Sequence, residues 1–253
     1  MPDIKDKNFM NLKMIHISSI DSTNNYAARL LSENQMSDNT LIIADYQEQG
    51  RGHGSNRWFS RPRKNLLASL YLIHTDILAV DQFVVNCIVS SAIADFLENE
   101  LKREVKIKWP NDIYVNRQKI AGLLIESFIT GERLTSSIIG IGLNVNERDF
   151  PPDIPNPTSM FLQDNQLRNP SQVGISITNK ILEMHTDKNQ YSRARNIYLD
   201  RLYQKGVEAN YLLLGKKIEA VITGIDNFGR LILRKGTYEY HCNFKEVVYL
   251  HNV

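Results

Sequence analysis

Runs of apolar residues between polar turns predict a β-sheet in the first 150 residues of the chain. The expected strands cover residues 41–44, 66–73, 105–109, 113–115, 120–128 and 136–146. From Asp81 to Leu101, apolar positions repeat with helical spacing and predict a long helix that covers the sheet. A polar cluster at residues 22–25 precedes a shorter helical pattern and predicts a helix N-cap.

A proline-rich connection separates this region from two further helices. Four of the eight prolines fall between residues 151 and 157, so residues 147–158 are expected to be a connection. Helices are expected at residues 173–185 and 191–204, the second closed by Gly206 as a C-cap.

Short alternating strands and tight turns begin at Lys216. The expected strands lie at residues 217–225, 230–234 and 238–243. The whole pattern predicts an α+β protein: a mixed β-sheet flanked by helices in residues 1–206, and a small β-barrel or appended sheet in residues 207–253.

Composition and charge are those of an ordinary globular protein, with 42% hydrophobic and 23% charged residues among 253. The net charge is only +2, so the chain is not generally basic, as a dedicated DNA-binding protein usually is. The first twenty residues lack a long apolar run, and we expect neither a secretory signal nor a membrane span. A cytoplasmic location is therefore expected.

Cysteine and histidine positions give no sign of a transition-metal site. Cys87 and Cys242 lie in an apolar helical pattern and a strand pattern, and both are expected to be core residues. The six histidines form no pair with metal-ligand spacing.

The most distinctive segment is basic and glycine-rich. Residues 47–64 contain three glycines and five arginine or lysine residues, with no acidic residue after Glu48. Glycines let a backbone turn its N–H groups toward an anion, and Arg51 and Arg57 add charge and forked donors. A phosphate-binding loop is one interpretation, and a solvated basic loop or nucleic-acid patch is the other.

A second segment, residues 108–112, reads Lys-Trp-Pro-Asn-Asp and is followed by Lys119 and Gly122. Proline fixes the turn, and a glycine in a strand lets a ligand approach closely. Taken alone, the segment is more typical of a turn after an edge strand, with Lys119 as a hairpin lysine. The only two tryptophans, Trp58 and Trp109, each lie in one of the two segments, which favours a shared pocket.

Five motifs in order make the chain resemble the biotin protein ligases. They are Asp21-Ser22-Thr23-Asn24; Gln47 with Gly50-Arg51-Gly52; Lys108-Trp109-Pro110-Asn111-Asp112; Lys119 with Ala121-Gly122; and Gly140-Ile141-Gly142-Leu143-Asn144-Val145-Asn146. The match runs from about residue 13 to the C-terminus. The resemblance implies a catalytic domain like the class II aminoacyl-tRNA synthetases and biotin synthetases, and an SH3-like C-terminal barrel.

The resemblance also implies a reaction and its residues. Biotin and ATP would form biotinyl-adenylate, and a lysine of a biotin carboxyl carrier protein would then take the biotinyl group. The implied catalytic residues are Arg51, Lys119 and Asp112. The implied biotin-binding residues are Ser22, Thr23, Asn24, Gln47, Gly50, Arg51, Gly52, His53, Lys119 and Gly122. The implied ATP-binding residues are Arg51, Trp58, Lys108, Asn111, Asp112, Lys119 and Asn144.

Magnesium is expected to travel with ATP, and Asp112 is a candidate to reach it. No other metal site is expected. A homodimer formed through a sheet edge is compatible with the resemblance.

The chain departs from the resemblance in two ways. The family loop carries arginines where this sequence has His53, Gly54 and Asn56, so we expect His53→Arg to reduce release of free biotinyl-adenylate. In addition, the first motif begins at Asp21, which leaves no room before it for the DNA-binding domain of repressor-type relatives. DNA binding is therefore not expected.

Two alternatives to biotin ligation stay open at this point. One is a lipoate-type ligase of the same fold, although Gln47 and the polar cluster at residues 21–24 suit a ureido ring better than a dithiolane. The other is a nucleic-acid-binding module that uses the basic loop and binds oligonucleotides in a salt-sensitive way. In the ligase interpretation, residues 50–60 form a mobile loop that closes over the adenylate and excludes water.

Overall fold

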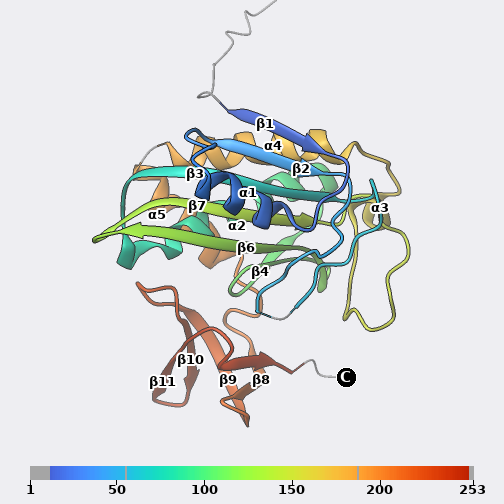
Figure 1. Cartoon of the computed structure of the whole chain (residues 1–253). Coiled ribbons are helices and arrows are strands. Elements are labelled where there is room, and N and C mark those ends of the chain that lie inside the picture. The colour runs from blue at the N-terminus through green and yellow to red at the C-terminus, as the bar shows by residue number, and fades with distance from the viewer. Residues whose placement is uncertain (1–11, 55, 187, 251–253) are drawn as a thin grey trace, which may run out of the picture.

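A seven-stranded mixed sheet forms the centre of the large domain in the computed structural model, which describes residues 12–54, 56–186 and 188–250 (Figure 1). The strands are β1 (Lys13–Ile17), β2 (Thr40–Ala44), β3 (Leu66–Leu78), β4 (Val105–Lys108), β5 (Asp112–Val115), β6 (Gln118–Thr130) and β7 (Arg133–Leu143). Their order across the sheet is β1-β2-β3-β7-β6-β5-β4. β1 and β2 are parallel, and every other neighbouring pair is antiparallel. The expected mixed sheet is confirmed.

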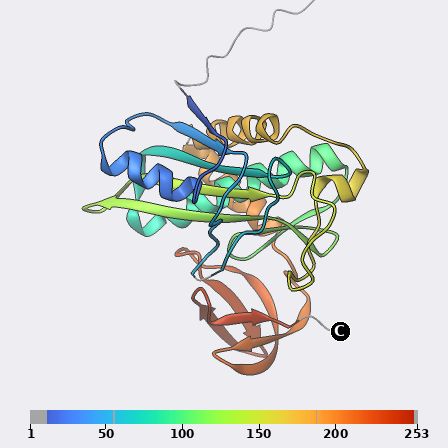
Figure 2. The ribbon, with the colours of Figure 1, turned by 45° about the vertical axis from the view of Figure 1, so that its right-hand side comes forward.

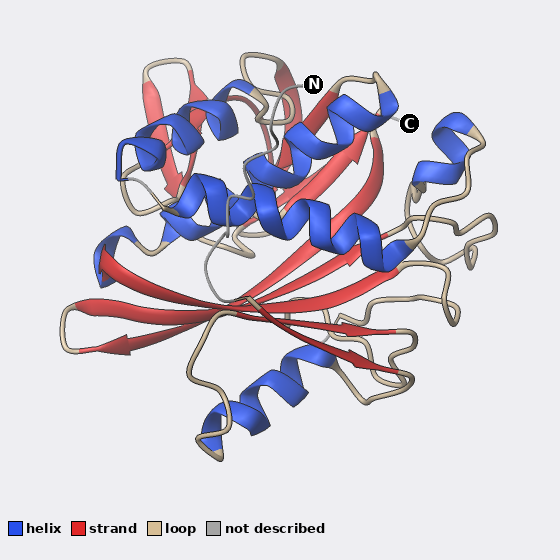
Figure 3. Ribbon diagram, turned by 90° about the horizontal axis from the view of Figure 1, so that it is seen from above, coloured by secondary structure: helices blue, strands red, loops and turns tan. Residues whose placement is uncertain are grey.

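Helices cover the two faces of this sheet unequally. The helices are α1 (Thr23–Ser32), α2 (Phe83–Leu101), α3 (Met160–Asp164), α4 (Pro170–His185) and α5 (Lys188–Asp200), with a short 3₁₀ turn, η1 (Ala79–Asp81), before α2. Helix α1 packs on one face over a small apolar cluster that includes Ala27 and Ile42. Helices α2, α4 and α5 pack together on the opposite side, over the main core (Figure 3).

The segment Ala79–Leu101 is long and apolar enough to cross a membrane by length and composition alone. Most of it is buried in this structure, where α2 packs against α4, α5 and β4. Its apolar composition is therefore that of a core helix. Cys87 is buried in this helix as expected, and Cys242 is buried in the small domain; both are free thiols.

The small domain is an antiparallel sheet of five strands below the large domain (Figures 1 and 2). Its strands are β8 (Glu208–Leu213), β9 (Lys216–Ile225), β10 (Leu231–Lys235), β11 (Tyr238–Cys242) and β12 (Val247–Tyr249), in the order β11-β10-β9-β8-β12. The β9–β10 turn contacts the large domain, where Trp109 Nε1 donates to the carbonyl of Gly229 at 2.8 Å. Gly229 has φ +82, and a Cβ there would lie 2.1 Å from Phe83 Cγ. Only glycine fits this contact. We propose the domain boundary at residues 206/207.

The structure differs from the sequence expectation mainly at short or exposed elements. Strands β1, β8 and β12 and helix α3 were not expected. Helix α5 ends at Asp200 and not at residue 204, because the following residues pair with β4. The amide of Ile107 donates to the carbonyl of Arg201 at 2.8 Å, and the amide of Tyr203 donates to the carbonyl of Ile107 at 2.8 Å. Gly206 is therefore not the C-cap of this helix; its amide donates to the carbonyl of Ile222.

Candidate active site

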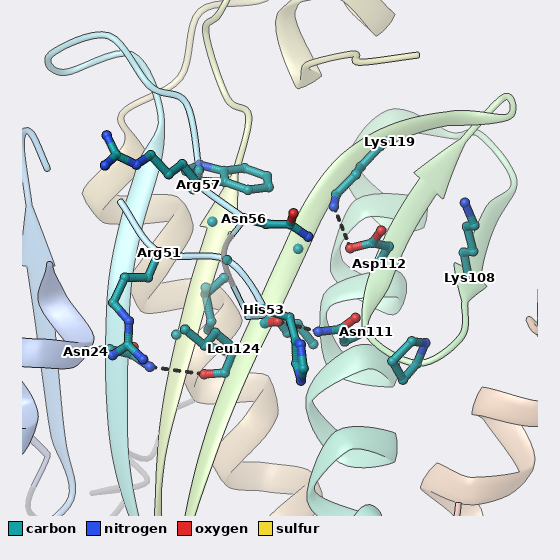
Figure 4. Close-up of a pocket in the computed structure, with 18 of the residues that line it drawn as sticks. Asn24, Arg51, His53, Asn56, Arg57, Lys108, Asn111, Asp112, Lys119 and Leu124 are labelled. Atoms are coloured by element: carbon teal, nitrogen blue, oxygen red, sulfur yellow. Dashed lines mark hydrogen bonds and ion pairs between the residues drawn. The ribbon is translucent and has the colours of Figure 1, made fainter. Parts of the chain in front are cut away.

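One cavity of about 310 Å³ lies between the large sheet and the small domain (Figure 4). It brings together thirteen of the residues that the sequence predicts as site residues: Ser22, Thr23, Asn24, Gln47, Arg51, Gly52, His53, Trp58, Lys108, Asn111, Asp112, Lys119 and Gly122. Two predicted residues, Gly50 and Asn144, do not line it. These predicted residues, which lie between Ser22 and Gly122 in the sequence, therefore meet at one place in the fold.

The start of α1 gives the cavity a hydrogen-bonding end. Gln47 Oε1 accepts from the amide of Thr23 at 2.8 Å and from its hydroxyl at 2.9 Å. These two donors fix the side-chain amide so that the Nε2 group of Gln47 is left to donate to a ligand. Ser22 is the N-cap residue of α1, yet its hydroxyl makes no capping bond and lines the cavity. Donors at this end suit a ligand carbonyl.

Asn24 ties this polar end to two strands, β3 and β6. The hydroxyl of Ser69, on β3, donates to Asn24 Oδ1 at 2.6 Å, and Asn24 Nδ2 donates to Glu126 Oε2 at 2.7 Å and to the carbonyl of Leu124 at 3.2 Å. A Cβ at Gly140 would lie 2.5 Å from Asn24 Oδ1. Glycine at position 140 is thus required for Asn24 to reach β6. Because the amide is fully bonded, Asn24 positions its neighbours more than it offers free donors.

The basic loop folds as a narrow hairpin arm, here defined as residues 50–58 without Ser55, which lies outside the described residues. The amide of Gly52 donates to the carbonyl of Asn56 at 2.8 Å, and the amide of Trp58 donates to the carbonyl of Gly50 at 2.9 Å. These two amides are therefore not available to an anion. Only Gly54, with φ +68, uses a backbone conformation that favours glycine. Gly50 is required for a different reason than expected: its Cβ would lie 2.5 Å from the Trp58 carbonyl oxygen.

Trp58 lies flat on β6 and β7 at two glycines. A Cβ at Gly142 would lie 2.5 Å from Trp58 Cε2, and one at Gly122 would lie 3.1 Å from Trp58 Cζ3. The close approach that we expected at Gly122 is thus made by the indole of the chain itself. Trp58 Nε1 is buried without a hydrogen-bond partner among the described residues, an arrangement that fits a donor reserved for a ligand.

The other end of the cavity carries cations. Lys119 Nζ pairs with Asp112 Oδ1 at 2.6 Å (Figure 4). Lys108 Nζ donates to the hydroxyl of Tyr114 at 3.3 Å and lies 4.7 Å from the ring centre of Tyr249. Burial lowers the pKa of Lys108, nearby Asp112 opposes this shift, and Lys119 adds to it. A desolvated cation of this kind gains most when an anion binds beside it.

Most cations of the basic segment are already paired, which argues against a nucleic-acid surface. Arg51 pairs with Glu126 at 3.0 Å, Arg61 with Glu147 at 3.2 Å, and Arg63 with Asp45 at 3.1 Å. Such internal pairs leave little charge for a phosphate backbone.

Sequence reasoning missed several residues of the site. Ser69 and Glu126 bond to Asn24 behind the cavity wall; each had one usable signal, a lone polar residue within an apolar stretch of its strand. Phe244, Lys245 and Tyr249 line the cavity itself, but nothing in the local sequence shows that the small domain contacts this site.

Asn144 occupies a position behind the cavity. Its Nδ2 donates to the carbonyl of Thr158 at 2.9 Å, whereas its Oδ1 is buried without a partner among the described residues. Contact of Asn144 with a nucleotide stays a prediction.

The two ends of the cavity define a site for a small molecule with a hydrogen-bonding head and an anionic tail. Residues 16–144 of the chain match the biotin/lipoate A/B protein ligase family, and the chain belongs to this family.

Similar proteins agree with this assignment. Over 226 residues the chain is 30% identical to the bifunctional ligase/repressor BirA of Escherichia coli, an alignment that covers 85% of this chain and 67% of BirA. The BirA of Bacillus spizizenii is 34% identical over 147 residues, which are 57% of this chain but only 45% of that relative. The fold is similar to that of the biotin protein ligase from Aquifex aeolicus in complex with biotin and ATP. The TM-score is 0.75 at 23% identity, with 93% of this chain and 97% of that chain covered.

Proposed function

We propose that this protein activates biotin with ATP and transfers the biotinyl group to a lysine of a biotin carboxyl carrier protein. The observation that carries this proposal is the two-ended cavity. The fixed amide of Gln47 and the hydroxyl of Ser22 suit the ureido head of biotin. Lys119 and Lys108 lie at the end where the carboxylate and the phosphates of ATP would meet.

In the first step, a carboxylate oxygen of biotin forms a bond to the α-phosphorus of ATP. The bond from that phosphorus to the oxygen bridging to the β-phosphate breaks, and pyrophosphate leaves. Both reactants are anions, so the site has to supply positive charge at the reacting oxygens. Lys119, held by Asp112, is the residue that we assign to this role, and Lys108 and Arg57 add charge along the phosphates.

Magnesium fits this scheme as an ion that arrives with ATP and neutralises phosphate charge. The described residues contain no group of three or more His, Cys, Asp or Glu that could hold a metal by itself. Asp112 is the carboxylate that lines the cavity, and magnesium bound to phosphates needs few protein ligands. We therefore propose Asp112 as the protein group nearest the ion.

In the second step, the amine of a carrier lysine attacks the acyl carbon of biotinyl-adenylate. The bond from that carbon to the phosphate oxygen breaks, AMP leaves, and the nitrogen loses a proton to solvent. The hairpin arm and Trp58 lie over the site, and we propose that they keep water from the mixed anhydride until the lysine arrives. Movement of the arm during this cycle stays a prediction.

Lipoate ligation is the second candidate, because the family includes lipoate ligases. The buried polar network of Gln47, Thr23 and Ser69 favours biotin, since a dithiolane ring has no carbonyl or N–H to satisfy these groups.

Calorimetric titration of the protein with biotin and with lipoate separates the two candidates. We expect binding of biotin and weaker or no binding of lipoate. Replacing Ser69 by alanine should weaken biotin binding, because it leaves Asn24 Oδ1 without its hydroxyl donor. Tighter binding of lipoate than of biotin would contradict the proposal.

The remaining partners are also proposals. The outer edge of β1 has no strand partner among the described residues, and we propose it as the edge for a homodimer. The opposite edge, β4, is partly covered by Leu202. We further propose that the enzyme acts in the cytoplasm, where ATP and its carrier are found.

A further inference from the structure

The small domain places a lysine in a backbone conformation that favours glycine. Residues 243–246 form a tight turn, in which the amide of Glu246 donates to the carbonyl of Asn243 at 3.1 Å and the amide of Asn243 donates to Glu246 Oε2 at 2.7 Å. Lys245 occupies the third position of this turn with φ +71. Glycine or asparagine is the usual residue there, and a lysine strains the backbone. The turn places the Lys245 side chain at the wall of the cavity.

The Lys245 side chain extends to the tip of the hairpin arm. Its Nζ lies 3.0 Å, and its Cε 3.6 Å, from the place that a Cβ of Gly54 would occupy. The preceding residue, Phe244, packs against His53 with ring centroids 3.8 Å apart and ring planes tilted by 59°. Burial, and secondly the charge of Lys245, lower the pKa of His53. The arm therefore presents a neutral imidazole at neutral pH, with the ammonium of Lys245 beside it.

Some cations among the described residues around the cavity lack a carboxylate partner, and the ammonium of Lys245 is one of them. Arg51 is neutralised by Glu126, and Lys119 by Asp112. Among the described residues that line the cavity, the cations without a carboxylate partner are Arg57, Lys108 and Lys245. Lys108 lies on the far wall, enclosed by tyrosine rings. On the side of the hairpin arm, the unpaired cations that a polyphosphate would meet are Arg57 and Lys245.

We propose that Lys245 binds the phosphates of the nucleotide and supplies, from the small domain, positive charge that the tip of the arm lacks. This inference rests on the proposed function, because it takes ATP as the ligand of the cavity. It makes the small domain part of the nucleotide site. Closing the site over ATP would then require the arm and the turn at residues 243–246 to stay together.

Three variants test this assignment, with α,β-methylene-ATP and magnesium as the probe, since this analogue cannot be cleaved at the reacting bond. Lys245→Gly removes the charge and preserves the turn, Lys245→Arg keeps the charge, and Lys235→Ala removes another exposed lysine of the same domain as a matched control. Calorimetry, with and without biotin, should show affinity for the analogue reduced roughly tenfold in Lys245→Gly. The Lys245→Arg and Lys235→Ala variants should stay within about threefold of the parent protein, and affinity for biotin should be unchanged in all three.

A second experiment restores positive charge at the tip of the hairpin arm. In a Lys245→Gly background, His53→Arg places a cation beside the vacated position and should recover most of the lost affinity. Equal affinity for the analogue in Lys245→Gly and Lys235→Ala would overturn the assignment. Binding of the analogue needs no turnover, so a parent protein that binds it but fails to bind biotin would contradict the proposed function and not the role of Lys245.

Discussion

Replacing Gly142 by alanine tests the packing of Trp58 on the strands of the site. The new Cβ would lie 2.5 Å from Trp58 Cε2, 2.7 Å from Cδ2 and 2.9 Å from Nε1, so the indole has to lift off β7. Overpacking of this kind costs about 1–3 kcal/mol. Alanine at an ordinary backbone conformation offsets roughly 0.4–1 kcal/mol by restricting the unfolded chain. We expect the free energy of unfolding to fall by about 1–2 kcal/mol.

Urea unfolding followed by circular dichroism measures this change in a double-mutant cycle with Trp58→Ala. Without the indole, Gly142→Ala should be neutral or slightly stabilising, which corresponds to a coupling energy of about 1–3 kcal/mol. Gly122→Ala is the milder comparison, because its Cβ would lie 3.1 Å from Trp58 Cζ3 and 3.4 Å from both Asp112 Oδ1 and Lys119 Cε. The same loss of stability with and without the indole would refute the proposed packing.

Three further predictions concern pH, the adenylate and the domain contact. Burial lowers the pKa of His74 to about 3 and that of His185 to about 4, so both are neutral in the folded state. Their contribution to stability is present above about pH 6.5 and is lost as the pH falls toward these values. Between pH 7 and 5, the free energy of unfolding measured in urea should fall less in His74→Asn than in the parent protein. An equal fall in both proteins would contradict this. His53→Arg should slow the release of free biotinyl-adenylate in a single-turnover assay, whereas an unchanged release rate would contradict a retaining role for the arm. Trp109→Phe removes the donor to the Gly229 carbonyl and should lower the free energy of unfolding by about 1–3 kcal/mol; a change below about 0.5 kcal/mol would show that this bond does not hold the domains together.

The central sheet and its long helix were predictable because their apolar runs are long and continuous. The elements that were missed lack such runs. Strand β1 is largely exposed and reads as a mixture of polar and apolar residues, and β12 is three residues long. The end of α5 was misjudged because pairing of the next residues with β4, a long-range contact, decides where the helix stops.

The candidate site was predictable where residues are close in sequence or resemble a family motif. Lys119 and Asp112 fall in this group, and their side chains pair at 2.6 Å. The partners of the motif residues were not predictable in the same way. The contact between Gly142 and the indole of Trp58 depends on how the hairpin arm folds back over the sheet. The approach of Lys245 to the arm depends on how the small domain packs against the large domain.

Biotin-dependent exchange of labelled pyrophosphate into ATP tests the proposed function most directly, because only reversible formation of biotinyl-adenylate produces it. The parent protein should catalyse exchange that requires biotin and magnesium. Lys119→Ala should reduce the rate by at least about a hundredfold, while Lys217→Ala, which removes an exposed lysine of the small domain, should leave it unchanged. Exchange that does not depend on biotin, or an equal rate in Lys119→Ala and the parent protein, would contradict the account.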